Sequence, residues 1–206
     1  MKEYFYKREY KYMYASIFFY NFAYALIETF GTVMLYQAGL PIYMILLIYG
    51  MRFLITGLIT PLFVTISNKI GVAKCVLISN IFSIINSYFM LNSENLYSNI
   101  IIFIIAMGLM GLSNPSSDSL SNKYVESKHR GRFNSIYFIS KILGIVLASV
   151  LVAWGIISNN KVVLLSIITI FYILQYIVIL QIDYKPEKKT NTFKFSIKYL
   201  LHSKSK

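Results

Sequence analysis

Long apolar stretches, separated by short polar segments, fill most of this chain. Each stretch is close to the ~20 residues that a helix needs to cross the hydrocarbon core of a bilayer. The stretches lack the alternating pattern of a barrel strand, and a lone strand would leave its backbone polar groups unpaired in lipid, so each one predicts a helix. The predicted spans are Tyr14–Tyr36, Ile42–Ile66, Cys75–Leu91, Ile100–Leu120, Phe133–Ile157 and Val162–Ile182.

Composition supports the same class of protein. Of the 206 residues, 57% are hydrophobic and only 14% are charged, which is more apolar surface than one soluble core of this size could enclose. We therefore predict an all-α integral membrane protein with a bundle of six transmembrane helices in residues 14–183. A basic cytoplasmic N-terminus, 1–13, carries tyrosines expected in an interfacial aromatic belt, and a basic cytoplasmic tail, 184–206, follows the bundle.

Lysine and arginine gather in alternate gaps between the predicted spans. They lie before the first span, in the gaps after the second and fourth spans, and after the sixth, whereas the opposite side carries only Lys161. The positive-inside rule then predicts a multi-pass protein of the cytoplasmic membrane with both termini in the cytoplasm. Topology and attraction to anionic head groups account for the net charge of +12, so membrane lipids are expected partners and nucleic acid is not.

The tail from Phe193 to Lys206 has two interpretations. Its apolar residues Phe193, Ile197 and Leu200 follow helical spacing, which suits an amphipathic helix on the cytoplasmic membrane surface with lysines among the head groups. A disordered basic tail explains the same composition equally well.

No residue pattern in the chain indicates an enzyme, a cofactor or a metal site. The single cysteine, Cys75, cannot form an internal disulfide and is expected to pack as a small apolar side chain. His129 and His202 stand apart in basic surroundings, without partner ligands nearby in the sequence. The sequence contains no P-loop pattern, nucleophile elbow or His-Glu-x-x-His helix.

The predicted loop between the second and third spans carries a recognisable motif. Its sequence at 64–74, VTISNKIGVAK, resembles the signature loop of the major facilitator superfamily, roughly Gly-x-Leu-Ala-Asp-Arg-x-Gly-Arg-Arg/Lys. Lys69, Gly71 and Lys74 match the basic, glycine, basic skeleton of that loop. The positions that differ are Val64 for the leading glycine, Asn68 for the acid and Val72 for a basic residue.

A second motif precedes the fifth span. The segment 126–135, ESKHRGRFNS, is similar to the Arg-Gly-Arg/Lys-x-Asn-Ser pattern often found there in the same superfamily. Gly131 is expected to allow a tight turn, and Arg130 and Arg132 to anchor at the head groups. The two motifs occupy the second and fourth loops of a six-helix unit with both ends inside, as they do in the superfamily.

The resemblance implies a fold, a substrate path and a partner. Members have two six-helix halves, each made of two inverted three-helix repeats, and the substrate path lies between the halves. The 206 residues correspond to the first half, so a second half or a copy of this chain is an expected partner, and a small solute, with or without a coupling proton, is the expected substrate. The fifth span lacks the Gly-Pro pair typical of drug–proton antiporters, so drug export is not favoured.

In the superfamily the first and fourth helices line the central cavity. The resemblance therefore implies that Asn21, Tyr24 and Glu28 on the first span, and Asn114 on the fourth, face the path. Ordinary hydrogen bonds between membrane helices are an equally good explanation of these polar residues. Asp118, near the cytoplasmic end of the fourth span, is expected to join the network of the signature loop and to act in gating.

Three charged residues lie within the predicted spans. Glu28 and Arg52 are at similar distances from the outer ends of their spans, so at ~1.5 Å per residue they share a depth and can pair. The pair is either a proton or substrate-cation site regulated by Arg52, or a structural pair that fixes helix packing. Lys141 either extends to the cytoplasmic interface or faces the cavity and joins the gating residues.

A stripe of small residues recurs at four-residue spacing in the fifth span. Its members are Ser140, Gly144 and Ala148. Small residues let membrane helices approach closely. We interpret the stripe as a packing surface, which a partner half could occupy.

Three functions follow from this sequence. The first is half of a secondary active transporter that moves a small solute by alternating access. The second is a non-transporting membrane protein derived from such a transporter, either a truncated remnant or an interaction or immunity factor, and the replaced residues of the signature loop favour it. The third is the membrane part of a transporter driven by a separate ATPase, for which the inner loops are short.

Overall fold

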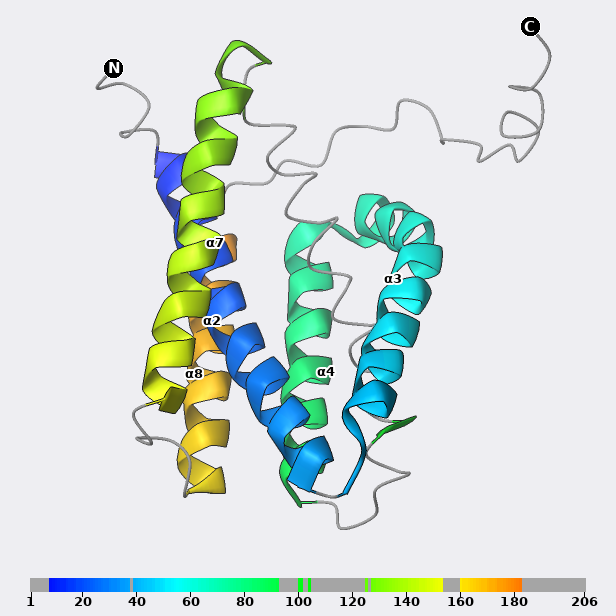
Figure 1. Ribbon diagram of the computed structural model, residues 1–206. Coiled ribbons are helices and arrows are strands. Elements are labelled where there is room, and N and C mark those ends of the chain that lie inside the picture. The colour runs from blue at the N-terminus through cyan, green and yellow to red at the C-terminus, as the bar shows by residue number, and fades with distance from the viewer. Residues whose placement is uncertain are drawn as a thin grey trace, which may run out of the picture.

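The computed structural model describes residues 8–37, 39–92, 100, 101, 104, 125, 127–153 and 160–182. The elements within these ranges are all helices (Figure 1). They are α2 (Arg8–Gln37), α3 (Ile42–Ile70), α4 (Val72–Asn92), the short 3-10 helix η1 (Ser127–His129), α7 (Arg130–Ala153) and α8 (Lys161–Leu180).

Five of these helices are long and apolar enough to cross a membrane. They coincide with five of the predicted spans, which are thereby confirmed as helices of membrane-spanning length. The other predicted span, Ile100–Leu120, lies almost wholly outside the described residues. α2 begins at Arg8, earlier than the predicted start at Tyr14, and Tyr10 and Met13 extend its buried face.

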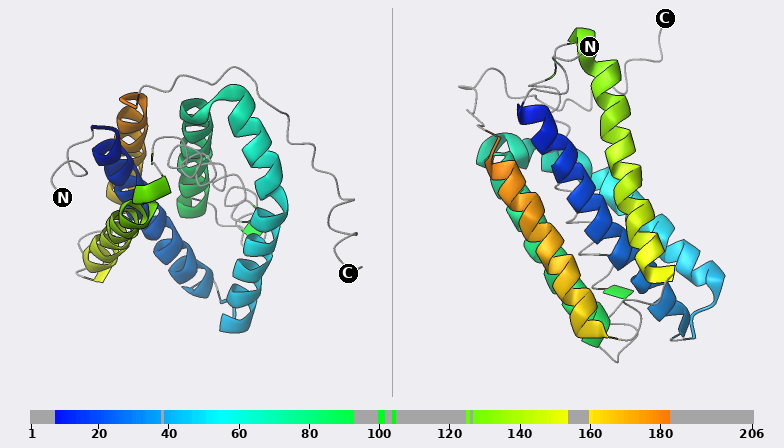
Figure 2. Two further views of the ribbon diagram at one scale, coloured as in Figure 1. Left: turned by 90° about the horizontal axis from the view of Figure 1, so that it is seen from above. Right: turned by 90° about the vertical axis from the view of Figure 1, so that its left-hand side faces the viewer.

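α2 is the central helix of the described bundle. It packs against α7 and α8, and α8 packs in turn against α4. The contacts of α3 with α4 and α2 are less extensive. Figure 2 shows α7 and α8 at one side of the bundle and α3 at the other, with α2 crossing between them.

Two buried clusters form the core. The larger one surrounds the middle of α2 and includes Leu26 together with Leu164 and Ile168 of α8. The smaller one lies at the Arg8 end of α2, where the rings of Tyr10 and Tyr14 pack against Phe133 of α7 with centroid separations of 5.3 and 5.1 Å. Tyr10, expected in an interfacial belt, is therefore buried against protein, and only 2% of it is exposed.

The stripe of small residues brings α7 against α2. A Cβ built on Gly144 would lie 2.6 Å from the backbone oxygen of Phe18 and 3.0 Å from the backbone nitrogen of Phe22. Gly144 and Ala148 are both buried on α7. The stripe is thus a packing surface, as expected, but a helix of this chain occupies its centre, so Gly144 is not available to a partner half.

Two glycines make the short connections around α3. Gly39, between α2 and α3, has φ 89°, and Gly71, between α3 and α4, has φ 90°, a region that side chains with a Cβ rarely adopt. The Gly71 N–H donates to the Ser67 carbonyl at 3.0 Å and closes the end of α3. The helical part of α3 also contains Pro61, which lacks an N–H, and the helix is visibly bent (Figure 2).

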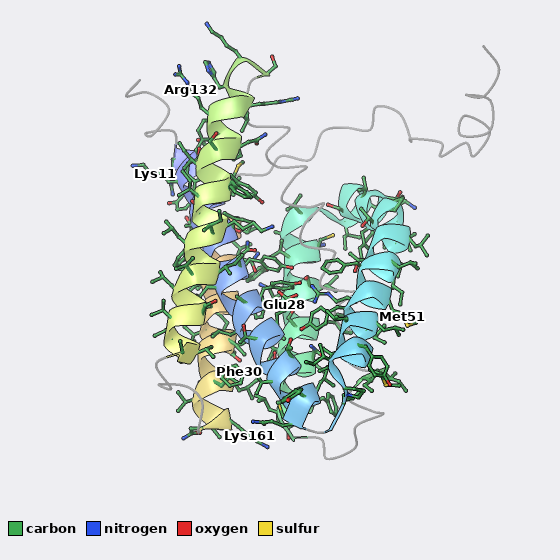
Figure 3. All side chains as sticks on the ribbon, viewed as in Figure 1. Lys11, Glu28, Phe30, Met51, Arg132 and Lys161 are labelled. Carbon is green, nitrogen blue, oxygen red and sulfur yellow. The ribbon has the colours of Figure 1, made fainter. Side chains whose placement is uncertain are left out.

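Basic residues lie at both ends of the bundle in the predicted arrangement. Lys11 and Arg132 are at one end, and Lys161 is at the opposite end (Figure 3). This separation agrees with the alternate gaps seen in the sequence. The assignment of the Lys11 end to the cytoplasm stays a prediction.

Candidate functional site

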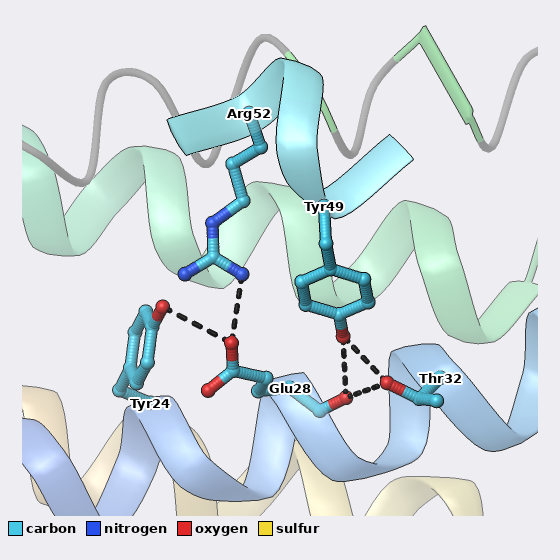
Figure 4. Close-up of polar contacts among 5 residues, drawn as sticks. All are labelled: Tyr24, Glu28, Thr32, Tyr49 and Arg52. Carbon is cyan, nitrogen blue, oxygen red and sulfur yellow. Dashed lines mark hydrogen bonds and ion pairs between the residues drawn. The ribbon is translucent and has the colours of Figure 1, made fainter. Parts of the chain in front are cut away.

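Glu28 of α2 and Arg52 of α3 form an ion pair. Arg52 Nη1 donates to Glu28 Oε1 at 2.8 Å (Figure 4). The Arg52 side chain is 5% exposed, whereas the Glu28 side chain is 34% exposed. An approaching species can therefore reach the carboxylate more readily than the guanidinium.

Aromatic rings enclose the Arg52 guanidinium. Its Cζ lies 5.3 Å from the ring centroid of Tyr24, 5.3 Å from that of Tyr49 and 4.9 Å from that of Phe53. The negative face of an aromatic ring attracts a cation, and the attraction strengthens where water is excluded. Arg52 is thus compensated by one carboxylate oxygen and three rings, which accounts for a charge this deeply buried.

The backbone carbonyl of Glu28 also accepts hydrogen bonds from side chains. Thr32 Oγ1 donates to the Glu28 carbonyl at 2.8 Å, and the Tyr49 hydroxyl donates to the same carbonyl at 3.1 Å. The two hydroxyls are also within hydrogen-bond distance of each other, at 2.5 Å. The Tyr24 hydroxyl donates to Glu28 Oε1 at 3.4 Å. These bonds fix the position of Glu28 relative to α3.

Helical spacing assembles these groups. Tyr24, Glu28 and Thr32 recur every four residues, so they lie on one face of α2. Tyr49, Arg52 and Phe53 are three and four residues apart and lie on the facing side of α3. About two turns of α2 and one turn of α3 are therefore enough to build the site once the two helices are adjacent.

Lys141 adds a second positive charge from α7. Its side chain is exposed, and its ammonium interacts electrostatically with the Glu28 carboxylate. Glu28 therefore lies in the combined field of a close arginine and a more distant lysine.

The remaining predicted cavity residues are not joined to this site in the described structure. Asn21 is buried, and its Nδ2 donates to the Ile17 carbonyl of its own helix at 2.7 Å. It lies at the crossing of α2 and α7, because its carbonyl carbon would be 3.5 Å from a Cβ on Gly144. Asn114 and Asp118 lie outside the described residues.

The signature-loop segment 64–74, predicted as a loop, is mostly helical: residues 64–70 end α3, residues 72–74 begin α4, and Gly71 alone separates the two helices. Lys69 and Lys74 are exposed on either side of Gly71, and the side chain of Asn68 is not among those described. Val72, at a position where the superfamily has a basic residue, is only 1% exposed and belongs to the smaller buried cluster. This position therefore packs in the core and carries no charge.

The second loop differs from its prediction at Gly131. This residue does not form a turn, because it is the second residue of α7 and its carbonyl accepts a hydrogen bond from Ser135 Oγ at 3.0 Å. The preceding 3-10 helix η1 makes the connection instead, so the helix starts before the glycine. Arg130 and Arg132 are exposed in the first turn of α7, and Arg130 Nε also donates to the Val125 carbonyl at 3.5 Å.

The sequence interpretation missed three contributors to the site. Thr32 and Tyr49 hold the Glu28 carbonyl, and Phe53 covers the Arg52 guanidinium. A signal was present for each, since Thr32 is one helical turn from Glu28, and Tyr49 and Phe53 are within one turn of Arg52. Residues within a turn of an intramembrane charge could therefore have been included as its partners.

The arrangement has the chemistry of a charge-binding site. Within the ranges that the structure describes, no three His, Cys, Asp or Glu side chains come together as a metal site would require. A single carboxylate held by an arginine can instead exchange that partner for a proton or for another cation. An anion would meet the carboxylate before it met the enclosed guanidinium.

Membrane-length helices around a partly buried ion pair define an integral membrane protein with an intramembrane charged site. The chain belongs to the Major Facilitator Superfamily, whose family model matches residues 12–205. This confirms the resemblance found in the two loops and places the chain among transmembrane transporters. No match is found among curated proteins.

Proposed function

We propose that this chain is a six-helix half of a secondary active transporter that moves a small solute across the cytoplasmic membrane by alternating access. Glu28 is the proton or substrate-cation site, and Arg52 is the internal cation that occupies the carboxylate when no ligand is bound. Membership of the superfamily supports the transport class. The observation that carries the role of Glu28 is the unequal exposure of the pair, 34% for Glu28 against 5% for Arg52.

The pair supports a simple exchange mechanism. A proton or cation that reaches Glu28 weakens its attraction to Arg52, and the Arg52 guanidinium keeps its three aromatic contacts while the carboxylate is occupied. The contact between α2 and α3 then loosens, because the ion pair directly links these helices. A change in the angle of α3 relative to α2 would open or close the path.

Alternating access requires a second half. We propose that another six-helix unit, or a copy of this chain, faces α2 and α3 across the path. The gate at the cytoplasmic end is formed by Lys69, Gly71 and Lys74 together with Arg130 and Arg132 of the second loop, with both termini in the cytoplasm.

Proton flux in proteoliposomes tests the role of Glu28. Purified protein is reconstituted with a pH-sensitive dye inside the vesicles, and a panel of small neutral, cationic and anionic solutes is added under an imposed proton gradient. We expect a solute-dependent proton flux that Glu28→Gln abolishes, because the amide can accept a hydrogen bond but cannot take up a proton. Glu9→Gln is the matched control, since Glu9 lies in the first turn of the same helix, away from Arg52.

Stability has to be separated from function in this test. Glu28→Gln/Arg52→Gln removes both charges and leaves no unpaired one, so a folded but inactive double variant would support a functional carboxylate. Unchanged flux and unchanged pH dependence in Glu28→Gln would refute the proton site. Solute uptake without proton movement would support a transporter and refute its coupling to protons.

A non-transporting role is the second candidate. The observation that favours it is Val72, which is buried where the superfamily has a basic residue, so the connection between α3 and α4 lacks part of the usual charge set. Absence of flux for every solute and gradient, from correctly folded protein alone and together with a second half, would favour this role.

A further inference from the structure

A second polar region lies inside the bundle, away from the ion pair. One face of α4 carries five polar residues that are all buried, with exposed fractions between 0% and 3%. On α8, Gln175 is 1% exposed and Tyr172 is 0% exposed. We name this region the polar seam; its members are Ser79, Asn80, Ser83, Asn86 and Ser87 of α4 and Tyr172 and Gln175 of α8.

The polar seam is poorly satisfied by protein groups. Ser83 and Ser87 donate to carbonyls of their own helix at 2.7 and 2.8 Å. Asn80 Nδ2 reaches across and donates to the Tyr172 carbonyl at 2.9 Å. Asn80 Oδ1, Gln175 Oε1 and both amide atoms of Asn86 are buried without a hydrogen-bond partner.

Such groups need partners more in a membrane than in a soluble protein. The lipid core offers none, and an amide buried without a hydrogen bond is unfavourable. α4 and α8 both have membrane-spanning length, and Asn86 and Gln175 lie within these spans. Something other than lipid therefore has to bind these atoms.

The orphaned atoms indicate the chemistry of the missing partner. Asn86 presents an unpaired donor and an unpaired acceptor, so its partner must both accept and donate. A metal cation would bind the oxygen and leave the Nδ2 donors unpaired. Asn80 and Asn86 are six residues apart, which is ~9 Å along a helix, so a single small ligand cannot serve both.

We propose that the polar seam binds internal water molecules at separate positions, one at the Asn86 amide and another near Asn80 and Gln175. Water donates and accepts, and buried water in proteins bridges polar groups that are otherwise unsatisfied. The seam is then a hydrated layer between α4 and α8. This proposal does not depend on the proposed transport role of Glu28, so it can be tested without a substrate.

A chain of tyrosine rings runs from the seam to the ion pair. Tyr172 packs against Tyr20 with ring centroids 6.4 Å apart, Tyr20 stacks on Tyr24 at 5.7 Å, and Tyr24 bonds to Glu28. Three tyrosine rings therefore connect the hydrated layer to the carboxylate.

Radiolytic hydroxyl-radical labelling of the full chain in lipid nanodiscs tests the proposal. Radicals formed from bound water oxidise side chains next to it, so Tyr172 should be oxidised although none of it is exposed. Phe133 is the control, because it is an equally buried aromatic residue, 3% exposed, in an apolar cluster. Brief mixing with ¹⁸O-labelled water before irradiation should leave ¹⁶O in the Tyr172 product, since a bound molecule exchanges slowly.

A variant assigns the labelling water to the site near Asn80. Asn80→Leu removes the orphaned Oδ1 beside the Tyr172 carbonyl and should reduce Tyr172 labelling several-fold, whereas Ile85→Leu, on the exposed side of α4, should leave it unchanged. Tyr172 labelling no higher than that of Phe133 in the unmodified protein would overturn the proposal. Labelling that persists in Asn80→Leu would refute the assignment to that amide. If the variant does not fold, the comparison of Tyr172 with Phe133 in the unmodified protein still tests the proposal.

Discussion

α2 and α3 are nearly equal in length but are held in the bundle by different forces. They have 30 and 29 residues, respectively. In the most hydrophobic part of α2, 50% of the residues are buried within the protein, against 17% in α3, although α3 has the higher mean hydropathy. Hydrophobicity therefore does not decide which helix is buried.

The contacts explain the difference. α2 meets α7 backbone to backbone at Gly144 and meets α8 through apolar and aromatic side chains such as Phe22 and Phe171, whose rings stack at 4.0 Å. α3 contributes Ile45 and Ile48 to the larger buried cluster and meets α2 through the Arg52–Glu28 pair and the Tyr49 hydroxyl. Close packing therefore fixes α2, whereas α3 has fewer apolar contacts and depends more on polar ones.

This difference suits a transporter. Close packing in a membrane is hard to shift gradually, whereas an ion pair can be exchanged for a proton or a ligand. A helix held by polar contacts can change its angle when one of its partners is occupied. We therefore expect α3 to change its position more readily than α2, and the α2–α7 crossing to be the fixed element of the described bundle.

The largest expected effect comes from separating the partners of the ion pair. Removing one partner of a buried pair destabilises a protein by about 3–5 kcal/mol, because the other charge stays buried alone. Glu28→Met should be more harmful than Arg52→Met, because Arg52 is 5% exposed and Glu28, at 34%, can still be solvated. Unfolding in mixed micelles with increasing dodecyl sulfate measures the two free energies.

The double variant decides whether polar contacts hold α3. Glu28→Met/Arg52→Met leaves no unpaired charge and should recover most of the lost stability. If the double variant loses as much stability as the two single variants added together, the contact between Glu28 and Arg52 does not stabilise the protein. Another contact must then hold α3.

The Glu28–Arg52 pair could be predicted from the sequence, because the depth of a residue in the membrane follows from its number of residues from the end of its span. Glu28 and Arg52 stand at equal depth on consecutive spans, and a short connection makes those spans neighbours. The polar seam could be recognised only in part. The four-residue spacing of Ser79, Ser83 and Ser87 is visible, but nothing local indicates that Gln175, far along the chain, completes the same buried region.

The bundle was predictable for a similar reason. Apolar length alone predicts each span, and glycine marks the connections at Gly39 and Gly71. The partner of the small-residue stripe was not predictable, because a stripe shows that some backbone approaches closely and does not show which one. The beginning of α2 at Arg8 also depends on a tertiary contact, the packing of Tyr10 on Phe133.

A smaller effect on stability is expected from replacing one glycine of α7 and one of α3 by alanine. Gly144→Ala places a Cβ 2.6 Å from the Phe18 backbone oxygen, so α7 has to move away from α2. Overpacking of this kind destabilises by about 1–3 kcal/mol. Gly57→Ala on α3 is the matched control: its Cβ would meet nothing within 4 Å, and alanine is favoured over glycine in a helix by up to ~1 kcal/mol.

The two alanine variants should therefore move the free energy of unfolding in opposite directions. Equal destabilisation would mean that α3 is packed as closely as α2, which contradicts the comparison. A neutral Gly144→Ala would mean that the α2–α7 crossing yields easily and is not the fixed element of this half.

The smallest expected effect tests a single polar contact of α3. Tyr49→Phe keeps the ring over Arg52 and removes the hydroxyl that bonds to the Glu28 carbonyl and contacts Thr32. Hydrogen bonds between membrane helices contribute about 0.6 kcal/mol on average and up to ~1.7 kcal/mol, so a loss in that range is expected from the same micelle titration. Tyr43→Phe, on an exposed part of α3, should cause no loss. If the two variants behave alike, the Tyr49 hydroxyl does not hold α3, and the ion pair alone accounts for the polar attachment of that helix.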